Sequence, residues 1–442
     1  MNMGKVALRG GVRINDGKKI SKDMPIKMLL PKGDAVYPLS QHIGLPARPV
    51  VAVGDAVSVG QIIAEAGGVV SANVVSGVSG KVKAIEERKT PAGTMCESIV
   101  IENDGKFTEI EGFGTEREYR ELSKGEIRQL IKDAGIVGMG GIGFPTHVKV
   151  TPKRDESIRY VIVNGTECEP YVTADYRRML EDSEKLVEGL RILLQLFEEA
   201  KGLFVIGADK KDVIRKISRL IKGDSRMGIK IVKTKYPQGA ERQIIKVATG
   251  RKLNSSMIPM DVGCLVHNAE TVIAVCEAVA KSVPLTRRVV SVTGDGIRAP
   301  QNLMVSLGTS CEEILEAAGG MEDTTRLVTA GGPLRGTQLT DLRVPLTKTV
   351  LALVVMKENI QERRSVSPCI HCGRCIAVCP GHLVPQRLIR CAEKEDKERF
   401  VRLDGMECCE CGSCSYVCPA GKELTAEFRR MRRSVLDERR KR

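Results

Sequence analysis

Short runs of alternating apolar and polar residues, interrupted by turn-forming pairs, occupy the first quarter of the chain. Residues 50–53 and 81–85 form two such runs, and the pairs Gly54-Asp55 and Ser79-Gly80 interrupt the pattern beside them. Alternation with a period of two puts one set of side chains on each face of a β-strand, while Gly, Asp and Ser favour tight turns. The pattern predicts a small β domain over the first 115 residues or so.

The apolar spacing changes to a helical period near residue 123. Ile127, Leu130 and Ile131 recur three and four residues apart. Ser123 stands three residues before Glu126, which is the spacing of a capping box. Expected strands then alternate with expected helices: strands at 160–163, 203–206 and 229–232, and helices at 183–199 and 210–221. This alternation predicts a layered α/β domain.

Two further units follow along the chain. After residue 286, strands expected at 289–293 and 326–330 flank a short helix expected at 309–318, which the pair Gly319-Gly320 ends. That order predicts a small α+β unit. The charged segment 361–366 is typical of a linker, and it leads into a cysteine-rich region.

A final helix is expected beyond Pro419. One of its faces is apolar, with Leu424, Phe428, Met431 and Val435 at helical spacing. The other faces are basic and carry Arg429, Arg430, Arg432, Arg433, Arg439, Arg440, Lys441 and Arg442. Two interpretations stay open for these basic side chains, a solvated tail or a helix that docks on an anionic partner or lipid surface.

Length, composition and charge limit the compartments and the partners that we expect for this protein. A length of 442 residues predicts two to four domains, and the best apolar run, residues 350–356, is only long enough for a strand. The first eleven residues, MNMGKVALRGG, contain no apolar core of a signal peptide, so we expect a protein that stays in the reducing cytosol. A net charge of +14 suggests acidic partners, but few aromatic residues and no nucleic-acid module argue against nucleic acid.

The cysteines carry the strongest signal. Ten of the 15 lie between Cys369 and Cys418, and in a reducing compartment they favour metal or redox chemistry over disulfides. The spacing C-x2-C-x2-C-x3-C-P occurs twice, which is the bacterial ferredoxin signature for two [4Fe-4S] clusters. Structural zinc would not explain the third cysteine of each C-x2-C-x2-C run or the proline after the fourth.

In two-cluster ferredoxins the fourth cysteine of each run binds the other cluster. We therefore expect two ligand sets that exchange their last members. The first cluster is assigned to Cys369, Cys372, Cys375 and Cys418, and the second to Cys408, Cys411, Cys414 and Cys379.

A glycine-rich loop, Gly138-Met139-Gly140-Gly141-Ile142-Gly143, satisfies G-x-G-x-x-G. Its surroundings differ from those of a Rossmann turn, which follows a strand and opens a helix, because a helical segment precedes this loop and Phe144-Pro145 follows it. Two interpretations remain, a cradle for a phosphate or a flat ring, and a plain structural turn.

Four longer motifs point to a family. Residues 138–149 and 164–170 resemble the flavin and NADH site of the NADH-oxidising subunit of respiratory complex I, and Tyr236-Pro-Gln-Gly-Ala-Glu241 and Val266-His-Asn-Ala-Glu-Thr271 match two further motifs of that protein in the same order. Three positions depart from its pattern: Met139 replaces an Arg, Thr166 an Asp and Ala240 a Glu.

The N-terminal motifs indicate which family the whole chain resembles. With Pro38-Leu-Ser-Gln-His-Ile-Gly44 first and the paired ferredoxin motif last, the chain resembles the RnfC component of the Rnf electron-transport complex over nearly its whole length. The resemblance implies a multidomain α/β and α+β fold with four domains. These are a barrel-sandwich hybrid at 1–115, an FMN-binding and NADH-binding α/β domain at 116–285, a β-grasp domain at 286–360 and a helical two-cluster ferredoxin-type domain at 361–442. The turn Ala66-Gly-Gly-Val69 lacks the lysine that biotinyl and lipoyl carriers modify, so no covalent arm is expected.

The resemblance also implies site residues. Around a non-covalent FMN it implies Gly138, Gly140, Gly141, Gly143, Lys149, Asn164 and Asn268. At the border between flavin and nicotinamide it implies Phe144, Glu167, Glu169, Tyr236 and Glu241. No catalytic side chain is expected beyond these cofactor contacts.

The function implied is that of a peripheral subunit on the cytoplasmic face of a membrane-bound, ion-translocating complex. NADH would reduce FMN, and electrons would pass singly to the clusters and on to partner subunits linked to ferredoxin. The expected partners are integral and peripheral membrane subunits of the Rnf complex. Two alternatives stay open. One is a non-enzymatic iron–sulfur adaptor, favoured by Met139 and Ala240. The other is a soluble flavin reductase of the cobalamin-reductase type, whose domain order is reversed, or of the proline-reductase-associated type.

Overall fold

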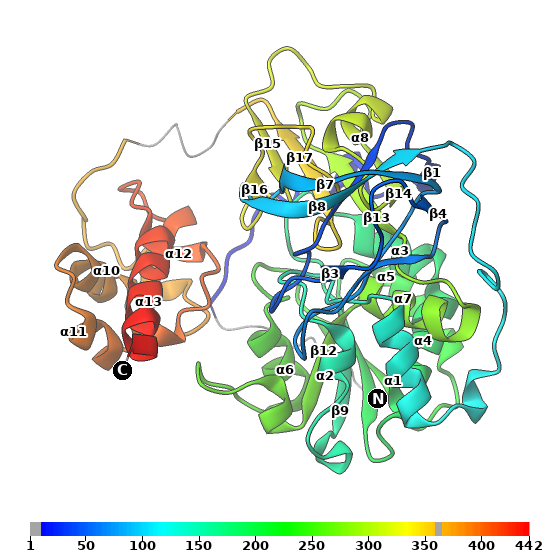
Figure 1. Ribbon diagram of the computed structural model, residues 1–442. Coiled ribbons are helices and arrows are strands. Elements are labelled where there is room, and N and C mark those ends of the chain that lie inside the picture. The colour runs from blue at the N-terminus through cyan, green and yellow to red at the C-terminus, as the bar shows by residue number, and fades with distance from the viewer. Residues whose placement is uncertain (1–9, 359–364, 442) are drawn as a thin grey trace.

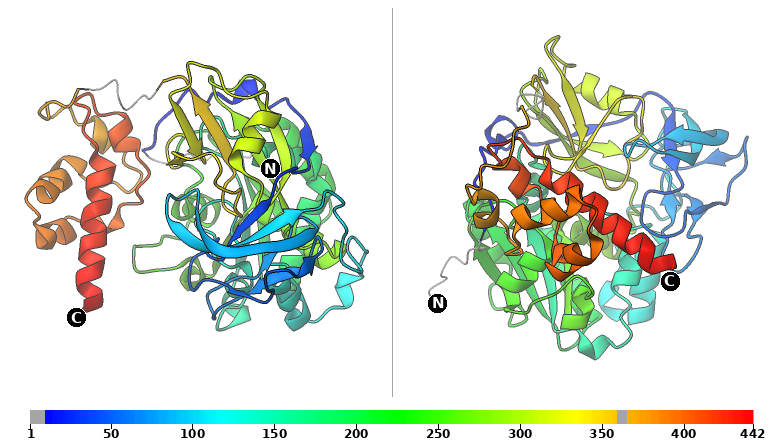
Figure 2. Two further views of the ribbon diagram at one scale, coloured as in Figure 1. Left: turned by 45° about the horizontal axis from the view of Figure 1, so that its top comes forward. Right: turned by 90° about the vertical axis from the view of Figure 1, so that its left-hand side faces the viewer.

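The computed structural model describes residues 10–358 and 365–441. Figure 1 shows a large body built from three sheet-containing units and, beside it, a smaller helical unit that holds the C-terminus. The left-hand view in Figure 2 shows the same separation, and in the right-hand view the helical unit lies in front of the body. The linker expected at 361–366 lies mostly outside the described residues.

The first unit contains two antiparallel sheets. Its strands are β2 (Ala35–Pro38), β3 (Arg48–Pro49), β4 (Ala56–Val57), β5 (Ile62–Glu65), β6 (Val74–Val75), β7 (Gly80–Lys89) and β8 (Met95–Asn103). The sheets are ordered β2-β8-β7-β4 and β3-β5-β6, and Tyr37, Ile63 and Ile99 are buried in one core. The run expected at 81–85 lies within β7. The strand expected at 50–53 is wrong, because Val50 and Val53 are exposed on a loop that leads into the turn at Gly54.

The second unit is a parallel sheet covered by helices. Its strands β9 (Tyr160–Gly165), β10 (Lys201–Gly207), β11 (Met227–Val232) and β12 (Cys264–Asn268) are ordered β11-β10-β9-β12. Its helices are α1 (Lys124–Asp133), α2 (Thr146–Lys149), α3 (Ala174–Glu181), α4 (Ser183–Gln195), α5 (Lys211–Leu220), α6 (Glu241–Thr249) and α7 (Ala269–Lys281). The expected α/β layering is confirmed, as is the capping box of α1: the Ser123 hydroxyl accepts from the amide of Glu126, whose carboxylate accepts from the Ser123 amide.

Both faces of this sheet are buried, which explains its nearly continuous apolar strands. Val161 and Val163 of β9 belong to the main core with α4 and α7, while Ile162 packs with Ile244 and Ile245 of α6 on the other face.

The third unit is a mixed sheet that recruits a strand from the start of the chain. Its elements are β1 (Ile26–Leu29), β13 (Arg287–Thr293), β14 (Gln301–Ser306), α8 (Cys311–Ala317), β15 (Leu327–Ala330), β16 (Thr337–Gln338) and β17 (Ala352–Met356). The order is β1-β14-β13-β17-β15-β16, with β1 parallel to β14. The division into four domains stays a prediction, and β1 crosses it because its edge pairing lies with residues 302–305 rather than with the first unit.

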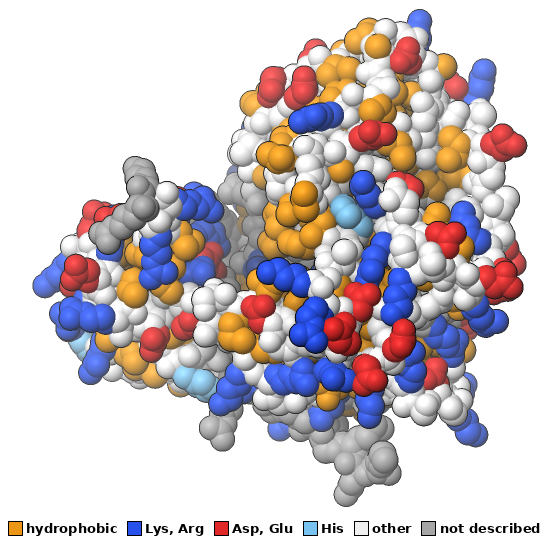
Figure 3. All heavy atoms as spheres, turned by 60° about the horizontal axis from the view of Figure 1, so that its bottom comes forward, with side chains coloured by type: hydrophobic (Ala, Val, Ile, Leu, Met, Phe, Trp, Pro, Cys, Tyr) orange, Lys and Arg blue, Asp and Glu red, His pale blue; other side chains and the backbone are white. Residues whose placement is uncertain are grey.

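The helical unit contains α9 (Arg374–Ala377), α10 (Pro385–Glu393), α11 (Lys397–Arg402), α12 (Ser413–Tyr416) and α13 (Leu424–Lys441). The apolar face expected for the last helix is confirmed, since Leu424, Phe428, Met431 and Val435 are all buried. Figure 3 shows Lys and Arg side chains, interleaved with acidic ones, over this unit and the adjacent face of the body. Among the helices of the described residues, none has the length and apolarity needed to cross a membrane.

One buried lysine joins the three sheet-containing units. Lys348, which precedes β17, is 0% exposed, and its Nζ donates to the carbonyl oxygen of Gly135 at 2.7 Å and to that of Asn73. Its backbone amide donates to Gln41 Oε1 at 3.2 Å, and its carbonyl accepts from the guanidinium of Arg288. Burial lowers the pKa of Lys348 to about 7.

This burial predicts a pH-dependent contribution to stability. Between about pH 7 and the usual lysine pKa of 10.5, the unfolded chain binds more protons at Lys348 than the folded chain, so stability rises with pH. The free energy of unfolding of the wild type relative to Lys348→Met should therefore increase from pH 7 to pH 9, by about 1 kcal/mol per unit. Denaturant unfolding at three pH values measures this difference. Lys357→Met is the matched control, because Lys357 pairs with Glu322 near the surface. The difference in free energy of unfolding between the wild type and this variant should not change with pH over the same range. A flat difference for Lys348→Met as well would contradict the prediction.

Candidate functional site

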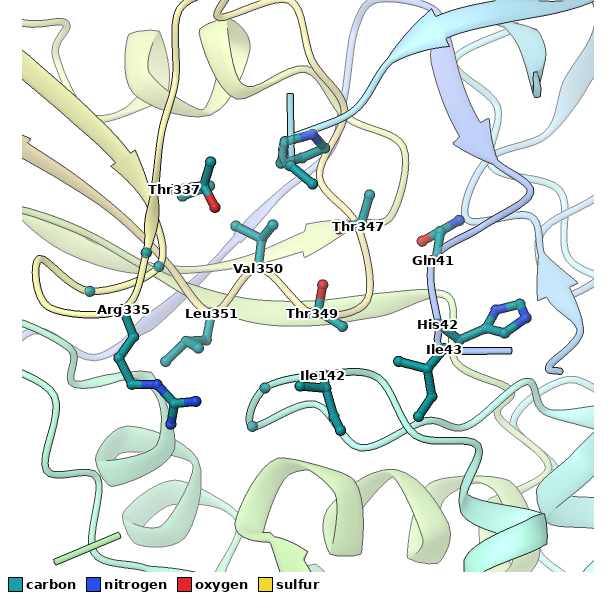
Figure 4. Close-up of a pocket in the computed structure, with 18 of the residues that line it drawn as sticks. Gln41, His42, Ile43, Ile142, Arg335, Thr337, Thr347, Thr349, Val350 and Leu351 are labelled. Atoms are coloured by element: carbon teal, nitrogen blue, oxygen red, sulfur yellow. The ribbon is translucent and has the colours of Figure 1, made fainter. Parts of the chain in front are cut away.

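A cavity of about 900 Å³ lies where the three sheet-containing units meet. It opens at the carboxyl ends of β9 and β12, the place where ligands bind in open parallel sheets. The glycine-rich loop and the segments after β9 and β11 line one side. Gln41, His42 and Ile43 of the first unit and Thr347, Thr349 and Arg335 of the third unit line the other sides, as Figure 4 shows.

The cavity wall contains some of the residues that the sequence predicts to contact FMN or NADH. The predicted residues in its wall are Gly140, Gly141, Asn164, Glu167, Glu169, Tyr236 and Asn268. Those outside the wall are Gly138, Gly143, Phe144, Lys149 and Glu241. Lys149 is held by the protein itself, because its Nζ donates to the carbonyl of Val266 at 2.5 Å and pairs with Glu241 at 3.1 Å. The cofactor roles of all twelve stay predictions.

The glycine-rich loop forms one wall of the cavity. It closes with a hydrogen bond from the Gly138 amide to the Phe144 carbonyl at 2.8 Å, and it lies between α1 and α2 rather than after a strand. The Rossmann turn is therefore excluded by the structure as well. A Cβ on Gly140 would stand 2.9 Å from the Cβ of Asn268, so only glycine fits that close approach. Ile142, 68% exposed, lies at the loop tip and borders the cavity.

Asn268 and Asp175 form a polar pair in the wall. Asn268 caps α7, since its Oδ1 accepts from the amide of Glu270 at 2.8 Å, and its Nδ2 donates to Asp175 Oδ2 at 2.6 Å. Burial, reinforced by the negative charges of Glu167 and Glu270, raises the pKa of Asp175 to about 7. Sequence reasoning missed Asp175 because it opens an ordinary helix outside every motif.

The two predicted glutamates that line the cavity are each held by polar contacts within the protein. Glu167 pairs with Lys18 at 3.1 Å and accepts from the amide of Tyr176 at 3.1 Å. Glu169 Oε1 accepts from the amides of Leu334 and Arg335, at 2.8 and 3.0 Å. Burial raises the pKa of Glu169, and these two amides oppose the rise. Apart from the amide of Tyr176, these partners come from the N-terminal segment and from the third unit, so the sequence around residues 167–169 does not predict them.

Tyr236 connects the cavity with the helical unit. Its ring lines the cavity at 3% exposure, and its hydroxyl donates to the backbone carbonyl of Cys411 at 2.6 Å. Burial, followed by the negative charge of Glu169, raises the pKa of Tyr236 far above its usual value. The phenol therefore stays protonated and available as a donor.

The cysteines of the helical unit line two separate hollows. One is lined by Cys369, Cys372, Cys375 and Cys418, and the other by Cys379, Cys408, Cys411 and Cys414 together with Cys409. Each hollow thus combines three cysteines of one run with the last cysteine of the other run, in the combination expected for two cubanes. Over the described residues, no three His, Cys, Asp or Glu side chains are placed to bind a single metal ion. A cubane differs in this respect, because each thiolate binds a different iron.

The hollow that contains Cys411 faces the body of the protein. Besides the Tyr236 contact, Glu407 pairs with Arg242 at 3.0 Å and accepts from the amide of Ser255 at 2.9 Å. The amide of Gly11 donates to the carbonyl of Val378 at 2.7 Å. In the other hollow, Cys369 and Cys372 are exposed. The four-thiolate sets and the glycine-lined cavity fit two iron–sulfur clusters and a flat nucleotide cofactor.

Comparison with protein families assigns the parts of the chain. Residues 6–106 match the RnfC barrel sandwich hybrid domain, residues 131–277 the Nuo51 FMN-binding domain and residues 368–422 a 4Fe-4S dicluster domain. The expected fold class and the expected FMN and [4Fe-4S] cofactors are confirmed.

Relatives over the whole length give the same result. The C-subunit of the proton-translocating ferredoxin:NAD(+) oxidoreductase complex of Clostridium ljungdahlii is 40% identical over 90% of this chain and 88% of its own length. The C-subunit of the Na(+)-translocating ferredoxin:NAD(+) oxidoreductase complex of Acetobacterium woodii is 35% identical over 100% of both chains. The C-subunit of the ion-translocating oxidoreductase complex of Rhodobacter capsulatus is 34% identical over 86% of this chain and 74% of its own length. The chain therefore belongs to the RnfC family, the C-subunits of Rnf complexes.

Proposed function

We propose that this chain passes electrons between NAD(H), FMN and two [4Fe-4S] clusters as a peripheral subunit of an ion-translocating complex, on the cytoplasmic face of the membrane. Integral and peripheral membrane subunits of the Rnf type are its partners, and one of them links it to ferredoxin. The names of the relatives support this proposal, because each is the C-subunit of an ion-translocating oxidoreductase complex.

The observation that carries the proposal is the position of Tyr236. One side chain borders the flavin-sized cavity and donates a hydrogen bond to the backbone of Cys411, a predicted cluster ligand. When bound, FMN exchanges a hydride with NAD(H) and single electrons with iron–sulfur clusters. The cavity and the hollow around Cys411 are adjacent, as such an exchange requires.

The residues of the chain have distinct tasks in this proposal. Gly140 and Gly141 leave room for a ring against the loop, and Asn268 and Asp175 present polar atoms to it. Asp175, with a pKa of about 7, can hold or release a proton near the cavity at neutral pH. Tyr236 fixes the helical unit against the cavity.

The two clusters also differ in role. Cys379, Cys408, Cys411 and Cys414 hold the cluster next to the cavity. Cys369, Cys372, Cys375 and Cys418 hold the outer cluster. Cys369 and Cys372 are exposed, and the neighbouring Ile370 is 67% exposed, which is the kind of apolar contact surface that a redox partner covers. The inner cluster therefore lies between the cavity and the outer cluster on the path of electrons to or from a partner.

Cofactor content and reduction by NADH test the proposal directly. Anaerobically purified protein should contain about eight irons, about eight acid-labile sulfides and one FMN per chain, and NADH should bleach the flavin. Iron, sulfide and flavin assays with absorbance spectroscopy on one sample measure this. Eight irons without bound or reconstitutable FMN would contradict the proposal and leave the iron–sulfur adaptor.

Cysteine variants test the order of the clusters. Cys411→Ser and Cys372→Ser should each lower the iron content to about four per chain. NADH should still reduce the remaining cluster in Cys372→Ser but not in Cys411→Ser, while bleaching the flavin in both. Electron paramagnetic resonance after NADH addition reports the reduced cluster. Cys409→Ser is the matched control, expected to keep about eight irons, and the opposite pattern for the two ligand variants would reverse the order.

The Tyr236 contact predicts a kinetic effect. Tyr236→Phe keeps the ring but removes the hydrogen bond to Cys411. If the barrier to cluster reduction rises by the about 0.5–1.5 kcal/mol that such a bond contributes, the step slows by about two- to twelvefold. Flavin bleaching by NADH should keep its rate. Rapid mixing with NADH, followed at flavin and cluster wavelengths, separates the two steps. Tyr160→Phe, at the far end of β9, should change neither rate, and equal slowing of both steps in Tyr236→Phe would argue against a role between the sites.

A further inference from the structure

The charges around the cavity are strongly unbalanced. Five carboxylates belong to its wall: Glu87, Glu97, Glu167, Glu169 and Asp175. Among the described residues of the wall, Arg335 is the only lysine or arginine. Lys149, which the motif resemblance places around FMN, is held by Val266 and Glu241 and is not part of the wall. A nucleotide phosphate entering this cavity therefore meets one cationic side chain.

The loop that carries Arg335 is built into the site. It connects β15 with β16, and its residues Gly331, Gly332 and Gly336 also line the cavity. Glu169 Oε1 accepts from the amides of Leu334 and Arg335. A Cβ on Gly332 would stand 1.9 Å from Glu169 Cγ, so only glycine allows this approach. Glu169, in the segment after β9 of the second unit, thus fixes the position of the third-unit loop that carries Arg335.

The guanidinium of Arg335 is available to a ligand. Its side chain is exposed and extends from the loop into the space beside Ile142, as Figure 4 shows. In the described parts of the chain, no carboxylate oxygen lies within ion-pair distance of this guanidinium. An arginine binds phosphate oxygens through two parallel N–H groups, which a lysine cannot do.

We propose that Arg335 binds the pyrophosphate of NAD(H), an inference that rests on the proposed function. We assign Arg335 to this pyrophosphate rather than to the phosphate of FMN because Arg335 is an exposed residue of the cavity wall, where a substrate can enter and leave. The Asn268–Asp175 pair, by contrast, lies in the wall at the carboxyl end of β12, where Asp175 is only 5% exposed. Arg335 is a binding residue and takes no part in hydride transfer.

Substitution of Arg335 tests the inference on the FMN-loaded full chain. Arg335→Gln should raise the KM for NADH about tenfold and leave kcat and FMN content unchanged, because only binding of the dinucleotide is weakened. ADP-ribose, which contains the pyrophosphate but no nicotinamide, should lose affinity by a similar factor in titration calorimetry. Arg335→Lys should recover part of both losses. Arg326→Gln, an exposed arginine before β15 and outside the cavity wall, is the matched control and should match the wild type.

The outcomes separate this inference from the proposed function. Unchanged NADH and ADP-ribose affinities in Arg335→Gln, with normal bleaching of the flavin, would overturn the role of Arg335 and leave the proposed function standing. Loss of FMN from Arg335→Gln would move the contact to the flavin phosphate and overturn the assignment to NAD(H). A wild type that NADH does not bleach would overturn the proposed function and the inference together.

Discussion

A single buried lysine holds together the walls of the cavity. Lys348 contacts the first unit through Asn73 and Gln41, and the second through Gly135, while its neighbours Thr347 and Thr349 line the cavity. Each contact satisfies a polar group that burial would otherwise leave unpaired, which costs about 1–3 kcal/mol. The site is therefore a junction of three units, and its shape depends on polar contacts among segments far apart in the chain.

The two cysteine sets of the helical unit have the same spacing but different surroundings. The ferredoxin runs are alike in spacing, yet Tyr236, Glu407 and Gly11 tie one side of the helical unit to the body. The opposite set remains at the surface with Cys369 and Cys372 exposed. The contacts with the body thus give a unit of two similar cysteine runs an inner end and an outer end.

The structure shows where the three departures from the complex I motif lie relative to the cavity. Met139, where that motif has an arginine, is 1% exposed in the main core and does not line the cavity. Thr166 donates to Asn164 within the wall, and Ala240 lines it without a charge. Among the lysines and arginines of the described wall, only Arg335, on a loop of the third unit, supplies a positive charge. Glu167 and Glu169 are held by Lys18 and by backbone amides.

The sequence by itself determined the features that local spacing encodes. The cysteine runs predicted the two ligand sets, the capping box the start of α1, and alternating patterns the strands of the second unit, because each depends on residues close together in the chain. The run at 50–53 misled because alternation does not distinguish a strand from an exposed loop. Only the tertiary structure decided that β1 joins the third sheet, that Lys149 lies outside the cavity, and that Asp175 and Arg335 lie within its wall. These outcomes depend on burial and on partners 93 to 276 residues away, about which no local pattern carries information.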